Sequence, residues 1–153
     1  VWNRTQFLKL AENEFPRAKR YRRPLSVILI TVDLDSLDPQ SQTNGLGAQI
    51  LRFIADCCKE NIRQIDILGR YEWNEFALLL PETDLAAAQM VARRLRKSVA
   101  NRPLDIPSSL DSIQVQIQLS SARDDFLDAE TMVAYAKRAV EVTSPIAKQE
   151  LMK

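Results

Sequence analysis

An apolar segment at residues 24–32 places the strongest constraint on how this chain can fold. The segment PLSVILITV is rich in β-branched residues and shows no alternation of apolar and polar positions. A strand with one face in water alternates, so a run without alternation indicates a strand that is covered on both faces. We therefore expect Pro24–Val32 to lie inside a sheet that packs against other elements on both sides.

Three further segments predict the remaining strands. Ile67–Tyr71 and Phe76–Leu80 are short apolar stretches separated by the tetrapeptide EWNE, and this spacing predicts a β-hairpin. The tetrapeptide is unusual because it has a tryptophan where a tight turn favours glycine. Ile113–Leu119 alternates strictly between apolar residues and glutamine. This alternation predicts a strand with an apolar inner face and a glutamine outer face.

Four segments show apolar residues at helical spacing, and we expect helices over Asn3–Arg22, Ala48–Asn61, Asp84–Ala100 and Ala129–Val142. Asn3 and Asp84 are the residue types that cap helix N-termini. The order α, β, α, β-hairpin, α, β, α predicts an α+β fold of the ferredoxin-like type, a sandwich with a central, mostly antiparallel sheet and flanking helices. Because there is no internal repeat and no second core, residues 1–153 are expected to form a single domain.

The charge balance and the residue inventory exclude several functions. The 153 residues carry 21 basic and 20 acidic side chains, a net charge of +1, which argues against nonspecific binding of nucleic acid. Histidine is absent from the sequence, and its absence excludes His-containing zinc sites and His-based catalytic triads. Cys57 and Cys58 are adjacent in a predicted helix and are interpreted as small core or boundary residues.

Two features of the chain bear on its cellular context. Its longest apolar run is too short to cross a bilayer, so we expect no membrane insertion by this domain, and unpaired cysteines favour a reducing, cytoplasmic compartment. The sequence begins VWNR without a methionine. We therefore expect the domain to have been cut from a larger multidomain chain.

Four strings, in order and at compatible spacing, make the chain resemble the GGDEF (diguanylate cyclase) domain family. They are NR…F at residues 3–7, RYRRPLS at 20–26, VDLD at 32–35, and RYEWNEFALLLP at 70–81, where the family has RYGGDEFALLLP. The resemblance covers nearly the whole chain and implies a GGDEF-type sandwich. Members of the family condense two GTP molecules into cyclic di-GMP, each domain of a dimer holding one GTP, with two metal ions bound by clustered carboxylates.

The hairpin motif itself departs from the family pattern. Glu72 and Trp73 stand where two glycines allow the backbone to approach the phosphates, and Asn74 replaces an acidic metal ligand. Glu75 and Phe76 keep the last two letters of the motif, and Phe76 is expected to pack in the core. We expect Trp73 to pack over the former nucleotide cleft or to offer an apolar contact to a partner.

Other positions that the family uses are also changed. Asp38 lies near the expected position of a phosphate-binding lysine, Ala48 replaces a guanine-reading aspartate, and Ser144 replaces a phosphate-contacting lysine. The resemblance therefore implies a degenerate domain with no catalytic residues. No metal site is expected, with Asp33 as the residual candidate, and no cofactor, with Mg²⁺ relevant only if GTP binding persists.

One set of residues matches the family's inhibitory product site. Arg63 and Asp66 form an RxxD string ahead of the hairpin, and Arg94 falls where a second arginine of that site is expected. An arginine can donate to the O6 and N7 edge of guanine or to phosphate, and a carboxylate can accept from N1 and N2. The resemblance thus implies a cyclic di-GMP site at these three residues.

Together these features favour a catalytically inactive GGDEF-type signalling module that binds cyclic di-GMP and acts through contacts with other signalling domains or proteins, a homodimer among them. Two alternatives stay open. The first is an active or weakly active cyclase, or a GTP-binding domain, for which Asp33, Asp35 and Glu75 leave some carboxylates. The second is a dimerisation or interaction domain without a ligand.

Overall fold

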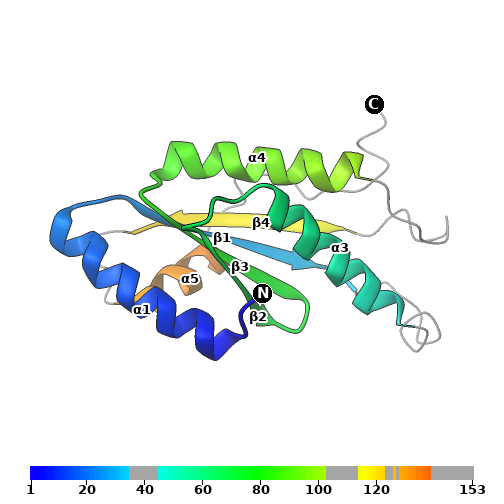
Figure 1. Ribbon diagram of the computed structural model, residues 1–153, viewed down its shortest axis with the longest axis horizontal. Coiled ribbons are helices and arrows are strands. Elements are labelled where there is room, and N and C mark those ends of the chain that lie inside the picture. Colours follow the sequence, from blue (N-terminus) through cyan, green and yellow to red (C-terminus); the bar gives the residue numbers. More distant parts are fainter. Residues whose placement is uncertain (35–44, 103–113, 123–125, 127, 139–153) are drawn as a thin grey trace.

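The computed structural model describes residues 1–34, 45–102, 114–122, 126 and 128–138 (Figure 1). Along the chain these residues form α1 (Arg4–Tyr21), β1 (Leu25–Val32), α3 (Leu46–Glu60), β2 (Ile67–Glu72), β3 (Glu75–Pro81), α4 (Leu85–Asn101), β4 (Val115–Ser121) and α5 (Ala129–Arg138). The predicted α+β order is confirmed. The last four residues of the predicted final helix lie outside the described part of the chain.

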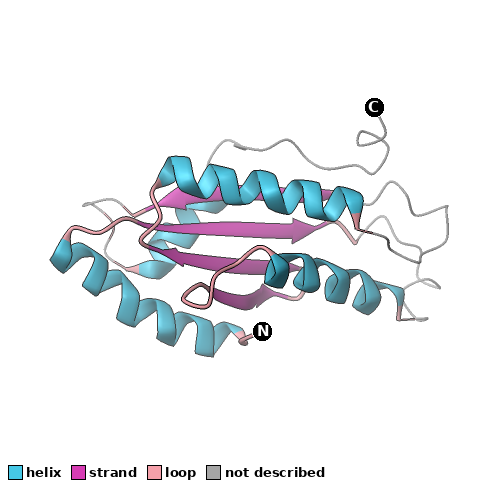
Figure 2. Cartoon of the chain, turned by 45° about the horizontal axis from the view of Figure 1, so that its top comes forward, coloured by secondary structure: helices cyan, strands magenta, loops and turns pink. Residues whose placement is uncertain are grey.

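The four strands form one sheet in the order β2-β3-β1-β4, and each neighbouring pair is antiparallel. Helices α3 and α4 pack on one face of this sheet, whereas α1 and α5 cover the other (Figures 1 and 2). The strand β1 lies inside the sheet and is buried on both faces, as its sequence predicts. Ile28 and Ile30 pack toward α3 and α4, and Val27 and Leu29 pack toward α1 and α5.

The caps of two helices also follow the sequence. The Asn3 side chain accepts a hydrogen bond from the Gln6 backbone N–H at 2.8 Å, and the Asp84 side chain accepts one from Ala87 at the same distance. Each cap satisfies one of the backbone donors that the first turn of a helix leaves without a partner. None of the described helices is both long and apolar enough to cross a membrane.

The β2–β3 hairpin is tighter than the sequence predicts. Glu72 and Glu75, expected in the connection, instead pair across the two strands, so that only Trp73 and Asn74 form the turn. The register shifts between Arg70 and Glu72, which marks an irregularity in β2 just before the turn. A bulge of this kind increases local twist and can re-aim side chains. It allows two glutamates to end the hairpin side by side.

The outer edge of β2 is covered by the first residues of the chain. Trp2 forms a parallel bridge with Gly69, in which the Trp2 N–H donates to the Leu68 carbonyl at 3.0 Å and Arg70 donates to the Trp2 carbonyl at 2.8 Å. Helix α1 then starts at Arg4 and packs Phe7 against Gly69. An edge strand protected in this way offers few unpaired groups to another sheet.

Both cysteines are buried in α3 and are unpaired. Burial raises the pKa of the Cys58 thiol to about 12, and burial also raises that of Cys57. Neither thiol is therefore a reactive nucleophile near neutral pH. The interpretation of the pair as small core residues is confirmed.

Candidate functional site

Trp73 lies at the turn of the hairpin, and its side chain is 60% exposed. The expectation that it packs over a nucleotide cleft is wrong. Its carbonyl accepts a hydrogen bond from Arg70 Nη1 at 3.1 Å, which fixes the turn backbone. The residue lies in the two-residue turn beyond the last cross-strand pair, Glu72 with Glu75. An exposed tryptophan is available for a contact with another molecule.

The exposure of Trp73 predicts efficient quenching of its fluorescence. In a Trp2→Phe variant, which isolates the Trp73 signal, acrylamide should quench emission at more than half the rate measured for free tryptophan. The same measurement on a Trp73→Phe variant reports Trp2, which is 48% exposed and should be quenched somewhat less. Quenching of Trp73 tenfold slower than free tryptophan would contradict the exposed position.

Asn74 joins the hairpin turn to the end of β1. Its carbonyl accepts a hydrogen bond from the Val32 N–H at 2.9 Å, and its side-chain amide donates to the Val32 carbonyl, also at 2.9 Å. An ionised carboxylate has no hydrogen to donate, so an aspartate could not make the second contact. Position 74 therefore uses its amide to close the ladder between β1 and β3, where the motif that it resembles has a metal ligand.

Glu75 is directed into the face of the sheet that α1 and α5 cover. It is 6% exposed, and its Oε2 accepts a hydrogen bond from Thr31 Oγ1 at 3.0 Å. Its Oε1 lies 3.2 Å from Lys137 Nζ as an ion pair, without the geometry of a hydrogen bond. Lys137 belongs to α5, so the glutamate ties the hairpin to that helix.

Glu72 and Phe76, which lie beside Glu75 in the hairpin, also make contacts within the domain. Glu72 accepts from Arg4 at 2.7 Å and lies 3.9 Å from Lys137, so two cations balance the two glutamates. Phe76 is fully buried on the opposite face, which confirms its expected place in the core. The Arg70 guanidinium lies 4.7 Å from the centre of the Phe76 ring.

The described residues do not fit a divalent-cation site. Within the described part of the chain there is no group of three or more acidic, cysteine or histidine side chains that could hold a metal. Asp33 is exposed at the end of β1, while Asn74 acts as a donor and Glu75 faces a lysine. Hard cations such as Mg²⁺ require several oxygen ligands. Of the other positions singled out in the sequence, the described part of the chain does not include Asp35, Asp38 or Ser144. Ala48 is described, and it is exposed in the first turn of α3.

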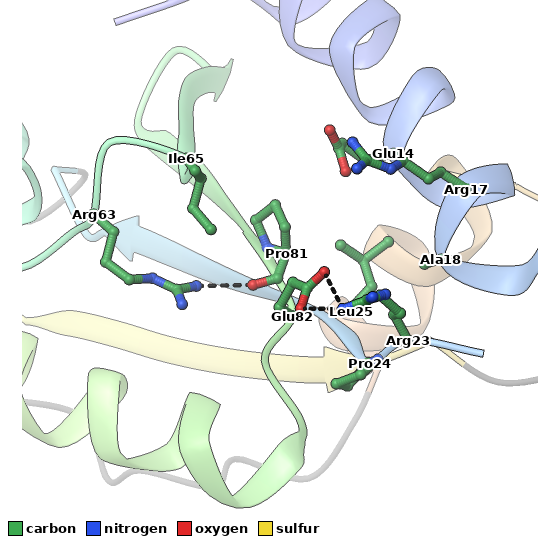
Figure 3. Close-up of a pocket in the computed structure, with 10 residues that line it drawn as sticks. All are labelled: Glu14, Arg17, Ala18, Arg23, Pro24, Leu25, Arg63, Ile65, Pro81 and Glu82. Carbon is green, nitrogen blue, oxygen red and sulfur yellow. Dashed lines mark hydrogen bonds and ion pairs between the residues drawn. The ribbon is translucent and has the colours of Figure 1, made fainter. Parts of the chain in front are cut away.

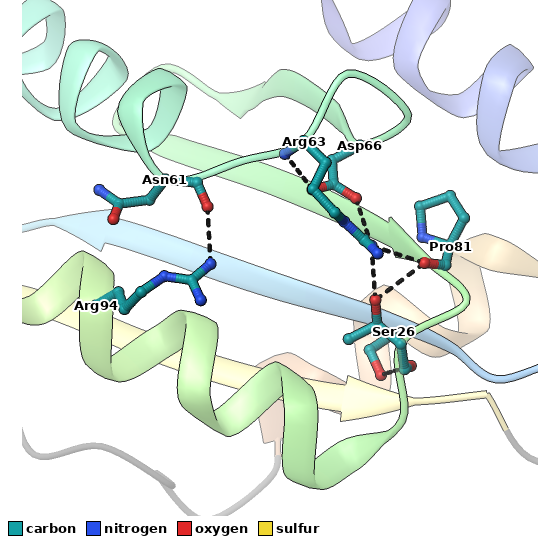
Figure 4. Close-up of polar contacts among 7 residues, drawn as sticks. Ser26, Asn61, Arg63, Asp66, Pro81 and Arg94 are labelled. Atoms are coloured by element: carbon teal, nitrogen blue, oxygen red, sulfur yellow. Dashed lines mark hydrogen bonds and ion pairs between the residues drawn. The ribbon is translucent and has the colours of Figure 1, made fainter.

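The other predicted site lies at the opposite end of β2, where Arg63 occupies the turn after α3 (Figure 4). Its Nη2 donates at 2.9 Å to Asp66 Oδ1, and at 2.8 Å both to the Pro81 carbonyl and to Thr83 Oγ1. Its backbone N–H donates to Asp66 Oδ2 at 2.7 Å, and its Nε contacts the same oxygen at 3.3 Å. The guanidinium is thereby fixed by partners from two segments of the chain.

Asp66 has a different position from the one that the sequence suggested. Its side chain is 3% exposed, whereas the Arg63 side chain is 52% exposed. Both Asp66 oxygens accept from Arg63, so the carboxylate lies behind the arginine and does not present an edge to solvent. The arrangement makes Asp66 the group that holds Arg63, and Arg63 the group that a ligand can reach.

Arg94 approaches the same turn from α4. Its Nη2 donates to the Asn61 carbonyl at 3.1 Å, and Asn61 is the C-cap of α3, two residues before Arg63 (Figure 4). The two arginines predicted for this site are therefore brought to one connection. Sequence reasoning missed Asn61, Pro81 and Thr83 as partners, and only the helix-end preference for asparagine could have indicated the first of them.

Comparison with known proteins places this arrangement in a family. A family model described as "Diguanylate cyclase, GGDEF domain" matches residues 1–147. The chain belongs to the GGDEF domain family. The predicted membership of this family is confirmed.

Curated relatives share this GGDEF domain as a part of longer proteins. Response regulator PleD of Caulobacter vibrioides is 30% identical over 118 residues, which cover 77% of this chain and 26% of PleD. Diguanylate cyclase DosC of Escherichia coli is 26% identical over 141 residues, which cover 92% of this chain and 30% of DosC. The chain therefore spans less than a third of the length of these two relatives.

Solved structures of GGDEF domains share the fold. The active GGEEF domain of a diguanylate cyclase from Vibrio cholerae matches with a TM-score of 0.74 at 24% identity, covering 91% of this chain and 88% of that one. The DgcB domain of Caulobacter crescentus in complex with c-di-GMP matches at 0.77 and 19% identity, covering 90% and 79%. Diguanylate cyclase SiaD of Pseudomonas aeruginosa, in complex with its activator SiaC, matches at 0.77 and 23%, covering 98% and 54%. The GGDEF-type sandwich is confirmed.

Proposed function

We propose that this GGDEF domain is a catalytically inactive signalling module that binds cyclic di-GMP through Arg63 and Arg94. The observation that carries the proposal is the contrast between the two ends of β2. At the hairpin end, Asn74 and Glu75 are engaged in contacts within the domain. At the other end, Arg63 is held in place by Asp66 and remains half exposed.

The contacts at the hairpin support the absence of cyclase activity. Phosphoryl transfer depends on metal ions and on donors that are already placed around the phosphates. In this chain the side chain at position 73 is an indole, and that at position 74 donates its amide to the Val32 carbonyl. Binding a metal ion through position 74 in the manner of the family would require this amide to give up its contact with Val32.

The chemistry of the Arg63 turn supports binding of a guanine nucleotide. The Nη1 group of Arg63 makes no hydrogen bond to the described residues, and Arg94 uses one nitrogen for the Asn61 carbonyl. Guanine O6 and N7, and phosphate oxygens, are acceptors that match such donors. Hydrogen bonds to charged groups contribute about 1.5–3 kcal/mol each, whereas micromolar affinity needs about 8 kcal/mol. Phosphate contacts and base stacking would supply the rest.

The regulatory output would pass through contacts with other domains or proteins in the cytoplasm. The related DgcB structure contains c-di-GMP, and the related SiaD structure contains an activator protein, which supports both kinds of interaction for this fold. The exposed Trp73 is the side chain of the hairpin best placed for such a contact. A homodimer is one form that the contact can take.

Calorimetric titration with cyclic di-GMP tests the proposed site. Arg63→Ala and Arg94→Ala should each weaken binding about tenfold or more, since each removes a charged donor. Asp66→Asn should weaken it less, because the amide can still accept from Arg63 although it carries no charge. Arg52→Ala, an exposed arginine on α3, is the matched control and should leave the affinity unchanged.

Ligand-dependent melting separates the alternatives. A ligand at 100 times its dissociation constant stabilises the folded state by about 2.7 kcal/mol. Stabilisation by cyclic di-GMP alone supports the proposal. Stabilisation by GTP with Mg²⁺ would favour a GTP-binding or weakly active cyclase, and no shift with either nucleotide would favour an interaction domain without a ligand.

A further inference from the structure

The outer side of helix α4 lies apart from both sites described above. A groove of about 350 Å³ between α1, the start of β1 and the end of β3 includes Arg63, so it belongs with the site at the turn before β2 (Figure 3). No residue of α4 lines that groove. The proposed site uses one residue of α4, Arg94, which is directed toward α3 and donates to Asn61 (Figure 4). The remaining exposed side of α4 is therefore a separate surface.

This surface carries two kinds of residue, arranged one after the other along the helix. Four residues of α4 are buried in the core, namely Ala88, Ala92, Leu95 and Val99. Leu85, at the start of the helix, is 46% exposed, and Met90 is 61% exposed on the side opposite to the core. Further along that side, Arg93 and Lys97 are exposed. We call the surface formed by Leu85, Met90, Arg93 and Lys97 the α4 surface.

The positive charge of the α4 surface has no counterpart within the helix. The 17 residues of α4 include four basic side chains and no acidic one. Arg93 and Lys97 form no ion pair with the described residues, and they are one turn apart, a spacing at which like charges destabilise a helix. They precede the last turn of α4, so the helix dipole does not account for them. A partner of opposite charge would remove this repulsion.

The carboxylates of the neighbouring helix are already paired. Glu60 of α3 lines the same hollow as Lys97, but it forms its ion pair with Arg102. Asp56 lies 3.9 Å from the same arginine. Within the described part of the chain, neither carboxylate pairs with the α4 surface, so the complementary charge has to come from another segment.

The order of the residues along α4 selects the kind of partner. Met90 and Lys97 lie on one side of the helix, two turns and about 10 Å apart. A helix that lies on a lipid surface separates its apolar and basic residues around its circumference and not along its length. A nucleic acid offers phosphates but no apolar side chain to cover Leu85 and Met90. A polypeptide can offer both groups in sequence, and methionine and arginine are enriched in protein interfaces.

We propose that the α4 surface docks an acidic polypeptide segment of a partner protein. An aliphatic or aromatic side chain of the segment packs on Leu85 and Met90, and its carboxylates pair with Arg93 and Lys97. The inference names a partner class for the protein contacts of the proposed function and rests on that function in this respect. It does not depend on cyclic di-GMP binding.

Photocrosslinking in cells that carry the native full-length protein tests the docking. The photoreactive residue p-benzoylphenylalanine replaces Ala86 or Asn101, which are exposed near the two ends of the α4 surface and leave its four residues intact. The same replacement at Asn13, exposed on α1, is the control. We expect one partner protein to crosslink at both α4 positions at least tenfold more than at Asn13. By mass spectrometry, its segment linked through Asn101 should carry at least two carboxylates.

Titration with the purified partner then tests the charges. The double variant Arg93→Glu with Lys97→Glu should lower the partner's affinity at least tenfold, because it replaces attraction by repulsion. Lys9→Glu with Arg17→Glu is the matched control, since it reverses two exposed charges on α1 and should leave the affinity unchanged. Arg94→Ala should weaken cyclic di-GMP binding and leave the partner's affinity unchanged, so failure of either proposal is recognised separately.

Each other outcome overturns the proposal. Equal crosslinking at the α4 positions and at Asn13 overturns the docking surface. A lipid or nucleic-acid adduct overturns the polypeptide, and an adduct with a second copy or another segment of this chain overturns the separate partner. A partner whose affinity survives reversal of Arg93 and Lys97 overturns recognition by charge. These residues are exposed, so the variants are expected to fold.

Discussion

The purified chain, incubated with GTP and Mg²⁺, is expected to form no cyclic di-GMP above a control without protein. The side chains of Glu72 and Trp73 occupy positions that are glycines in the family's motif. The Asn74 amide is bound to the Val32 carbonyl, and Glu75 is paired with Lys137. Because the glycines and one acidic metal ligand of the motif are absent together, we expect the cyclase activity to be lost entirely and not only to be slower. Chromatography of the nucleotides after prolonged incubation measures the product.

A double variant tests whether the hairpin alone accounts for the loss. Trp73→Gly with Asn74→Asp restores two letters of the motif, but Ala48 and Ser144 remain in place of an aspartate and a lysine. We expect this variant to remain inactive. An active member of the family, assayed in parallel, is the positive control. Product from the unmodified chain would overturn the proposed inactivity, and product from the variant alone would show that the hairpin was the only barrier.

Gly69→Ala is expected to destabilise the fold by about 1–3 kcal/mol through overpacking. A Cβ atom at this position would lie 2.6 Å from Phe7 Cβ and 2.8 Å from two atoms of the Phe7 ring. Phe7 is fully buried and packs edge-on against Tyr71, so it cannot move aside without disturbing α1. The position therefore requires glycine because the helix approaches the strand so closely.

Gly47→Ala is the matched control, because it adds the same methyl group where there is room. The nearest atom to a Cβ at Gly47 is Leu34 Cδ1 at 3.8 Å, an ordinary contact, and alanine favours the helix in which Gly47 lies. Thermal unfolding compares the two, with about 2–4 °C expected for each kcal/mol. A melting temperature for Gly69→Ala equal to that of Gly47→Ala would contradict the packing of Phe7 on β2.

The sequence by itself determined the elements and their order. The unbroken apolar run at Leu25–Val32 required a strand covered on both faces, and β1 lies between β3 and β4 with a core on each side. Local rules were sufficient there because burial on two faces leaves no polar position in the pattern. The same holds for the Asn3 and Asp84 caps, where one side chain satisfies a backbone donor three residues away.

Only the tertiary structure decided how the side chains of the two sites are used. The exposure of Trp73 depends on the pairing of Glu72 with Glu75, which Arg4 and Lys137 stabilise from helices distant in sequence. The RxxD string gave Arg63 and Asp66 as neighbours, but the burial of the carboxylate depends on packing around the turn.

The hydrogen-bond partners of Arg63 are the clearest example of contacts that local sequence patterns cannot predict. Pro81 and Thr83 accept from its guanidinium although they are 18 and 20 residues away along the chain. The groove beside it is formed by α1, β1 and the end of β3, which no local pattern relates to one another. Periodicity and capping report contacts within a few residues, whereas these contacts exist because the sheet brings distant segments together.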